Sequence, residues 1–261
     1  MSPAGVFEPV DGGFLPTDAA RGPWNPGMLH GGAVGALLAG LLDHPEQVTT
    51  RIVVELLGPV PAELLAADVE PTEGGRRVMR QSATLRAGDR PVARAMALRM
   101  RRADLDLPAR ATAHPVVFDP TAVPALDAPI GQARDSIGWD CFDTLAVAMR
   151  FGRGRSEGRA RTWLRLLLPI VAGRPASPLA TVVAAADYAS AGTSLRLDFA
   201  DWSFMNADLV VSLRRPASGG WIGLESDGYL AATGTGQSVA TIHDHEGLVG
   251  QSSQSLLIEP R

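Results

Sequence analysis

The chain has 261 residues, enough for one large or two small domains, and its 46% hydrophobic and 20% charged residues are typical of globular proteins. The formal net charge of −4 argues against binding of a nucleic-acid backbone as the main role. All 24 basic residues are arginine, and the absence of lysine excludes Schiff-base and pyridoxal-phosphate chemistry. The single cysteine, Cys141, excludes an intrachain disulfide and a cysteine-rich zinc site, and we expect it to be a buried apolar residue.

The N-terminal sequence MSPAGVFEPVDGG lacks the positive and apolar regions of a signal peptide. The apolar stretches elsewhere are too short, or too interrupted by charge, to span a bilayer. We therefore expect a cytoplasmic protein whose partners include neither a membrane nor a nucleic acid.

The first half of the chain predicts one helix followed by several strands. Residues 27–44 place Val34, Leu37 and Leu38 at helical spacing, with glycine and alanine at most other positions. So many small residues indicate that other elements pack closely around this helix. Residues 50–60 are rich in β-branched side chains, and residues 66–104 show three further strands separated by turns at two glycine-containing segments.

The second half repeats this order after a proline-rich stretch. Residues 144–154 and 160–171 have the pattern of strands, and Ser177 to Ser190 predict a second helix rich in small residues. Further strands are expected at residues 204–216, 220–233, 236–244 and 247–261. The repeated order indicates an internal duplication of the α+β class. We predict an N-terminal unit at residues 1–104, a linker at 105–137 and a C-terminal unit at 138–261.

Common catalytic motifs are missing from the sequence. There is no G-x-S-x-G elbow, and the glycines around Thr235 lack the third glycine of a dinucleotide loop. The five histidines are scattered. His243 and His245 flank Asp244 in a segment for which we favour a solvated turn over a metal or proton-relay site. No metal or redox cofactor is expected.

The start of the first predicted helix is the strongest candidate for a ligand site. His30, Gly31 and Gly32 open this helix, where unpaired amides and the helix dipole favour negative charge. Such amides could stabilise the oxyanion that forms when a thioester carbonyl is attacked. Alternatively, the two glycines only allow tight packing of helix against sheet. Trp24 lies just before the helix, where it could line a substrate channel or simply pack.

Long segments in both halves resemble the TesB-like acyl-CoA thioesterases. RGPWNPGMLHGGAVGALLAGLLDH followed by RIVVELLGPVP is similar to the first half of that family. NADLVVSLRRP, GGWIGLES and GTGQSVATIHDHEGLVGQSSQSLLIEP are similar to the second half, in matching order. The resemblance implies a double hotdog fold, in which one chain imitates the dimer of single-hotdog enzymes.

The resemblance also implies a set of catalytic residues. In that family an Asp, a Gln and a hydroxyl orient a water molecule for attack on the thioester. The matching segments place Asp208 and Gln254 in the first two roles, and the hydroxyl falls near Tyr229, with Ser226 and Thr233 as neighbours. No threonine stands at the expected position. Taken without the resemblance, Asp208 and Gln254 would fit equally well as polar residues on the wet face of a sheet.

Single-hotdog thioesterases with an HGG sequence carry an acidic residue seven positions after the second glycine, whereas this chain has Ala39 there. The mechanism based on a carboxylate of the first helix is therefore not expected here. The Gly-Asp-x-Asn-Pro run of the hydratase branch is also missing.

The resulting hypothesis is hydrolysis of an acyl-CoA, with coenzyme A entering only as part of the substrate. The expected catalytic residues are Asp208, Gln254, Tyr229 and Thr233, and the expected substrate-binding residues are Trp24, His30, Gly31 and Gly32. Two alternatives stay open, a non-catalytic acyl-CoA-binding protein and a hydratase or dehydratase of enoyl thioesters. The double hotdog units could also pair into a homo-oligomer.

Overall fold

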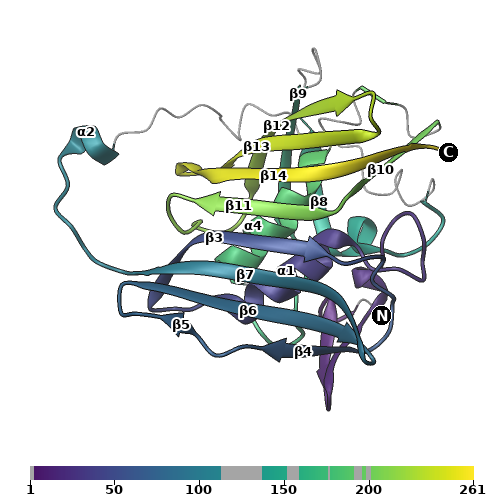
Figure 1. The fold of residues 1–261 in the computed structure, drawn as a ribbon, viewed down its shortest axis with the longest axis horizontal. Helices are drawn as coiled ribbons and strands as arrows, with labels where there is room; N and C mark the ends of the chain where they lie inside the picture. Colours follow the sequence, from purple (N-terminus) through teal and green to yellow (C-terminus); the bar gives the residue numbers. More distant parts are fainter. Residues whose placement is uncertain (1–2, 113–136, 152–158, 176, 191–195, 198–200) are drawn as a thin grey trace.

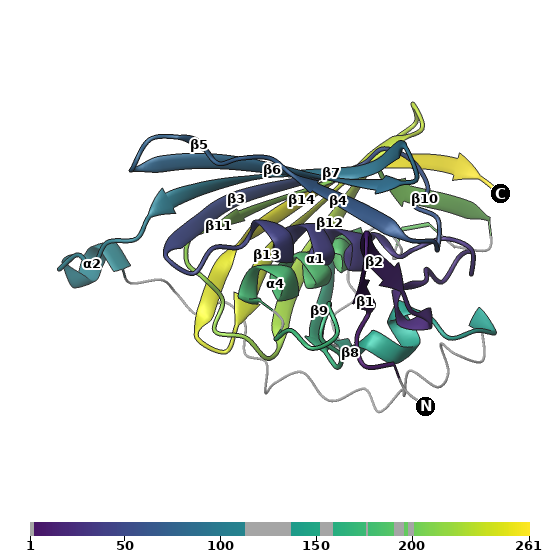
Figure 2. The same cartoon turned by 90° about the horizontal axis from the view of Figure 1, so that it is seen from below.

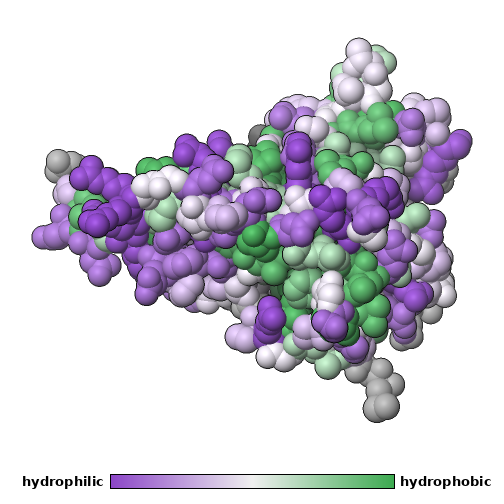
Figure 3. All heavy atoms as spheres, turned by 60° about the horizontal axis from the view of Figure 1, so that its bottom comes forward, coloured by the Kyte–Doolittle hydropathy of each residue, from purple (hydrophilic) through white to green (hydrophobic). Residues whose placement is uncertain are grey.

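The structure, a computed structural model, describes residues 3–112, 137–151, 159–175, 177–190, 196–197 and 201–261. Strands form one antiparallel sheet, and the two longest helices lie side by side against one face of it (Figures 1 and 2). Hydrophilic side chains cover the end of the molecule that carries α2, and hydrophobic side chains form patches over the rest of the face shown in Figure 3.

The first half contains one long helix and seven strands. The elements in chain order are β1 (Phe7–Val10), β2 (Gly13–Pro16), α1 (Gly31–Leu42), β3 (Gln47–Leu56), β4 (Leu65–Val69), β5 (Glu73–Gly74), β6 (Val78–Ala87), β7 (Arg90–Arg101) and the short α2 (Ala109–Thr112). A single 3-10 turn, Asp18–Ala20, precedes α1. The expected helix and the meander that follows it are confirmed, with turns at Gly74 and Gly88.

The second half follows the same plan. Its elements are a helical turn at Phe142–Ala146, β8 (Val147–Phe151), β9 (Arg159–Leu166), α4 (Pro178–Ala186), a 3-10 turn at Asp187–Ser190, β10 (Trp202–Asn206), β11 (Asp208–Leu213), β12 (Ile222–Ala231), β13 (Thr235–Asp244) and β14 (Gly247–Pro260). The segment expected as one strand at residues 204–216 is divided at Ala207, whose amide donates to the carbonyl of Ser255. Thr144 to Ala146, expected to begin a strand, are instead helical.

The two halves share one sheet. Its strand order is β1-β2-β4-β6-β7-β3-β11-β14-β13-β12-β9-β8, with β10 paired to the end of β14 and β5 to β6. The seam between the halves is the antiparallel pair β3–β11, in which Val54 lies opposite Leu209. β1, at one end of this order, also contacts the chain that leaves β9 near the other end, because the amide of Phe7 donates to the carbonyl of Ile170. The sheet therefore wraps around both helices.

α1 and α4 pack in antiparallel directions. A Cβ built at Gly32 would lie 3.1 Å from the carbonyl oxygen of Ala184, whereas one built at Gly40 would lie 3.9 Å from Cβ of Ala180. The start of α1 thus meets the end of α4, as the small residues of both helices allow. Buried side chains from both helices and from the inner faces of both half-sheets form one continuous core.

The two junctions between the helices differ in chemistry. Where α4 begins, Ser177 caps the amide of Ala180, and Pro178 occupies the first turn. Where α1 ends, the buried guanidinium of Arg99 donates to the carbonyl of Leu42 at 3.2 Å. A side chain of the protein therefore already binds the C-terminal end of α1. The other junction, at the start of α1, is described below.

This architecture is the double hotdog of the α+β class that the sequence predicts, with one long helix in each half wrapped by antiparallel strands. The N-terminal hairpin β1–β2 was not anticipated, because its strands are only four residues long and include prolines. The division at residues 1–104, 105–137 and 138–261 stays a prediction, since most of the expected linker, residues 113–136, lies outside the described residues.

Candidate active site

The first turn of α1 contains amides without an internal partner, and Gly31 is the first of them. His30 is the N-cap of this helix, and its Nδ1 accepts a hydrogen bond of 3.0 Å from the amide of Gly32. The amide of Gly31 makes no hydrogen bond within the described part of the chain. Of the two amides expected to polarise a carbonyl, Gly31 is thus the one available to a ligand.

A carboxylate from the second half lies directly at this helix start. Asp187 follows the last residue of α4, and a Cβ built at Gly31 would lie 3.0 Å from its Oδ1. A Cβ at Gly32 would lie 3.3 Å from Cβ of Asp187. The two glycines therefore permit a close approach that any larger residue would obstruct. This is a local reason for the Gly-Gly sequence, beyond packing of helix against sheet.

Two amide side chains complete the surroundings of Asp187. Asn206, the last residue of β10, donates from Nδ2 to Asp187 Oδ1 at 2.7 Å. Gln254 of β14 is only 1% exposed, and its Nε2 donates to the backbone carbonyl of Asp187 at 3.0 Å. Among the residues that the structure describes, the buried Oε1 of Gln254 finds no hydrogen-bond partner. A buried acceptor without a partner is costly, so a bound molecule that donates to it would relieve that cost.

The imidazole of His30 lies between two carboxylates. Its Nδ1 is 3.4 Å from Asp187 Oδ2, and its Nε2 is 3.7 Å from Oδ2 of Asp143, which belongs to the helical turn before β8. The ring stacks on Tyr188 with a centroid distance of 5.2 Å. Tyr188 in turn donates from its hydroxyl to Asp143 Oδ1 at 2.8 Å. Because Nδ1 accepts from Gly32, neutral His30 carries its proton on Nε2, facing Asp143.

Burial controls the electrostatics of this cluster. The pKa of Asp187 is raised by burial, and this effect is opposed by His30, by the hydrogen bond from Asn206 and by the amide of Gly32. The pKa of Tyr188 is raised well above its usual value by burial and by the charge of Asp143, so the phenol keeps its proton and acts as a donor.

The arrangement suits acid–base chemistry on a carbonyl compound. It combines a basic carboxylate, an unpaired main-chain donor at a helix N-terminus and a buried amide acceptor. Within the described residues, no group of three or more histidine, cysteine, aspartate or glutamate side chains is arranged to hold a metal ion.

The sequence matches the profile of the acyl-CoA thioesterase C-terminal domain over residues 54–258. The chain belongs to the acyl-CoA thioesterase family. Its enzyme class is therefore that of a thioester hydrolase, and the predicted TesB-like relationship is confirmed. A comparison with curated proteins gives no match.

Solved structures share the fold of this thioesterase. A protein assigned as a thioesterase from Novosphingobium aromaticivorans is 21% identical, with a TM-score of 0.68 and coverage of 88% of this chain and 87% of that one. A hotdog-fold protein from Alicyclobacillus acidocaldarius is 17% identical, with a TM-score of 0.66 and coverage of 93% and 90%. Acyl-CoA thioesterase II from Mycobacterium marinum is 14% identical, with a TM-score of 0.63 and coverage of 88% and 89%.

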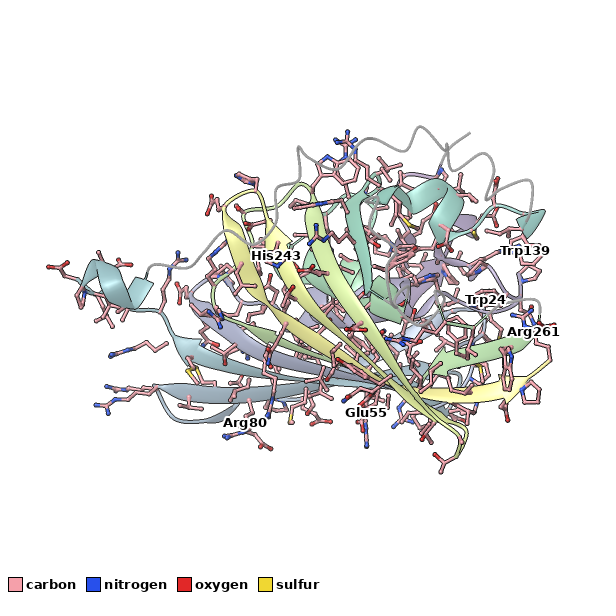
Figure 4. All side chains as sticks on the ribbon, turned by 90° about the horizontal axis from the view of Figure 1, so that it is seen from above. Trp24, Glu55, Arg80, Trp139, His243 and Arg261 are labelled. Atoms are coloured by element: carbon pink, nitrogen blue, oxygen red, sulfur yellow. The ribbon has the colours of Figure 1, made fainter. Side chains whose placement is uncertain are left out.

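Asp208, expected to be the catalytic acid of the thioesterase, lies elsewhere. Leu209 and Val211 of β11 enter the core, so the alternation of the strand turns the side chain of Asp208 to the outer face of the sheet. There Oδ1 accepts a hydrogen bond of 2.7 Å from the amide of Ser255. Its cross-strand neighbour Glu55 lies on the face away from the helices (Figure 4). The structure does not bring Asp208 to the start of α1.

Of the expected hydroxyl residues, Tyr229 and Thr233 are also apart from the cluster around Asp187. Tyr229 is 54% exposed on β12, and Thr233 lies in the exposed turn before β13, where it bonds Thr235. Ser226 is buried on the inner face of β12. A hollow of about 440 Å³ opens on the outer face, but its lining contains none of the residues around Asp187; it includes Val210, Glu225, Tyr229, Thr241 and Ser253.

Of the residues singled out in the sequence, His30, Gly31, Gly32 and Gln254 come together in the structure. Asp187, Asn206, Asp143 and Tyr188 were not anticipated. One signal was available, because Asp187 is the lone acid that ends an otherwise apolar helix, where the helix dipole disfavours a negative charge.

Two further expectations can be compared with the structure. Cys141 is buried, as predicted. The turn expected beside Asp244 is present and exposed at His245 and Glu246, but His243 and Asp244 are buried at the end of β13. Burial would raise the pKa of Asp244, but hydrogen bonds from Arg215 and Ser218 lower it strongly, so the carboxylate fastens this turn.

No helix among the described residues is long and apolar enough to cross a membrane.

Proposed function

We propose that this protein hydrolyses an acyl-CoA thioester with Asp187 as the general base. The observation that carries this proposal is the position of a buried carboxylate beside the unpaired amide of Gly31, with Asn206 and Gln254 around it. Asp208, favoured by the sequence alone, is replaced by Asp187 in this role.

The proposed reaction begins with the carbonyl oxygen of the thioester accepting a hydrogen bond from the amide of Gly31. A water molecule donates one hydrogen to Asp187 and the other to Oε1 of Gln254. Its oxygen attacks the carbonyl carbon while Asp187 takes the first proton, giving a tetrahedral oxyanion that the helix N-terminus stabilises. When the oxyanion collapses, the carbon–sulfur bond breaks, the sulfur takes the proton from Asp187, and the free acid and coenzyme A leave.

In this scheme Asn206 and His30 act as positioning residues. Asn206 holds Oδ1 of Asp187, which leaves the remaining lone pairs of the carboxylate for the water. His30 occupies the Gly32 amide and thereby leaves Gly31 as the oxyanion donor. Asp143 lies near Nε2 of the imidazole, and Tyr188 donates a hydrogen bond to Asp143.

The test is release of free thiol from a panel of acyl-CoAs by Asp187→Asn and Asp208→Asn. Loss of a general base is expected to lower kcat by about 10²–10⁴-fold in Asp187→Asn. Asp208→Asn is the matched control, since it removes one carboxylate from the outer face of the sheet, and it should retain activity. Loss of activity only in Asp208→Asn would overturn the assignment. A wild type that binds acyl-CoA without releasing thiol would make the protein a binder.

A second candidate reaction is favoured by the contact between His30 and Asp187. An imidazole 3.4 Å from a carboxylate of the other half is an acid–base pair that could hydrate an enoyl thioester or dehydrate a 3-hydroxyacyl thioester. Such a reaction would change the ultraviolet absorbance of the enoyl group. We expect no such change. A change in enoyl absorbance that wild type catalyses and His30→Phe does not would favour this candidate instead.

A further inference from the structure

An exposed tryptophan and an arginine face each other at one end of the molecule. Trp24 is 61% exposed, and the guanidinium carbon of Arg261 lies over its indole ring, 5.4 Å from the centroid. Figure 4 shows both residues at the same end as Trp139. The exposed part of this indole ring offers aromatic surface on which a planar ligand ring can stack.

Hydrogen bonds connect the loop that carries Trp24 to the candidate active site. Its two ends are joined by a hydrogen bond of 2.8 Å from the amide of Gly22 to the carbonyl of Met28. Trp139 Nε1 donates to the carbonyl of Gly22 at 3.1 Å, and the amide of Phe142 donates to the carbonyl of Arg21. Phe142 directly precedes Asp143, so the same segment contacts both the loop and His30.

Arg261 reaches the same place from the other side of the site. Its amide donates to the backbone carbonyl of Asp201, and its Nε donates to the carbonyl of Trp202 at 3.2 Å. Trp202 begins β10, which ends at Asn206 beside Asp187. At about 3.3 Å per strand residue, this end of β10 lies about 13 Å from the amide that holds the proposed base.

The guanidinium of Arg261 is the second feature of this end of the molecule. Within the described residues it forms no ion pair, whereas Arg21, near the same loop, pairs with Asp18. A guanidinium above an aromatic ring keeps in-plane N–H donors for an anion, and phosphate is a favoured partner. A protein with a net charge of −4 also needs a local cation to bind a polyanionic substrate.

We propose that Trp24 and Arg261 bind the nucleotide end of coenzyme A, with the adenine stacked on the indole ring and a phosphate paired with the guanidinium. The pantetheine arm then bridges the distance from this pair to the carbonyl at Gly31. Aromatic stacking and charge-assisted hydrogen bonds are the interactions by which proteins commonly bind adenine and phosphate. This subsite rests on the proposed function, because it assigns the carrier part of the same substrate.

The test compares two thioesters with the same acyl group, one on coenzyme A and one on pantetheine, which lacks the nucleotide. Trp24→Ala and Arg261→Gln are each expected to raise KM for the coenzyme A thioester about tenfold, with kcat within about twofold of wild type. Kinetics on the pantetheine thioester should be unchanged. An equal rise in both KM values, or no rise for the coenzyme A thioester, would overturn the subsite.

A matched control is Arg150→Gln. Arg150 also stacks on a tryptophan, Trp221, at 4.6 Å, but in a separate cluster with Trp163 beside β9. This variant removes a stacked guanidinium away from the site and should leave both KM values at the wild-type level.

Binding of adenosine 3′,5′-bisphosphate, measured by calorimetry, separates this proposal from the proposed hydrolysis. Wild type should bind this fragment saturably, and Arg261→Gln should bind it about tenfold more weakly. This result would support the subsite even if no thioester were hydrolysed. Equal affinity in wild type and in both variants would overturn it, whatever the hydrolysis assays show.

Discussion

Asp187 combines two opposing environments in one side chain. It follows the C-terminal end of α4, where a negative charge is disfavoured, and it faces the N-terminal end of α1, where a negative charge is favoured. Burial is the largest influence and raises its pKa. A base with a raised pKa accepts a proton from water more readily than an ordinary aspartate.

The activity should therefore depend on pH through Asp187. Because only the carboxylate form accepts a proton, kcat/KM should fall as the pH is lowered, with a midpoint above the ordinary aspartate pKa of about 3.9. The measurement is the rate of thiol release across the acidic range. A rate that stayed constant to below pH 4 would contradict the role of this residue.

The free energy of unfolding should also depend on pH, but here the protonated form of Asp187 is the favourable one. Since the folded-state pKa of Asp187 is raised, its protonated form favours the fold, and this contribution is lost as pH rises through the folded-state pKa. Asp187→Asn stays neutral, so its free energy of unfolding relative to wild type should increase over that interval. Urea unfolding at several pH values measures this difference. A difference that did not vary with pH would contradict the prediction.

At the scale of elements, the close approach of Asp187 to the start of α1 requires glycine, which has no side chain, at Gly31. In Gly31→Ala the added methyl would lie 3.0 Å from Asp187 Oδ1, so the carboxylate must shift from its bond with Asn206. We expect at least a tenfold loss of kcat, because a small misplacement of a catalytic group is costly. Thiol release and thermal unfolding should be measured together.

The control for this substitution lies in the same helix. A methyl added by Gly40→Ala would meet its nearest neighbour, Cβ of Ala180, at 3.9 Å, an ordinary contact. Replacing a helical glycine by alanine should stabilise the protein by about 0.5–1 kcal/mol and leave activity unchanged. Equal losses of activity in both variants would show that the helix, and not the contact with Asp187, is responsible.

Local patterns were sufficient to predict the two long helices and the meanders that follow them, but not the hairpin β1–β2 or the division between β10 and β11. Small residues at helical spacing indicated α1 and α4, and alternation with glycine turns indicated the meanders. The same alternation could have warned against Asp208, because its neighbours Leu209 and Val211 are two residues apart and enter the core. Asp187 could not be found this way, since its contact with Gly31 depends on how two helices distant in the sequence pack together.

At the scale of the molecule, the two halves should unfold together. β3 and β11 join the half-sheets, and one core contains residues of both. Far-ultraviolet circular dichroism reports on both halves, whereas four of the five tryptophans, Trp139, Trp163, Trp202 and Trp221, lie in the second. The denaturation curves from dichroism and tryptophan fluorescence should coincide. Two separated transitions would contradict a shared core.

Duplication of a unit would in principle give two equivalent junctions between antiparallel helices, yet this chain keeps the requirements of a site at only one. At the junction opposite Asp187, Pro178 stands where a helix N-terminus could have offered an amide, and the guanidinium of Arg99 occupies the end of α1. The inherited symmetry is therefore broken. A titration of this protein should count a single substrate molecule per polypeptide, and saturation should be hyperbolic, because the part of the chain that the structure describes holds no twin site to communicate with the first.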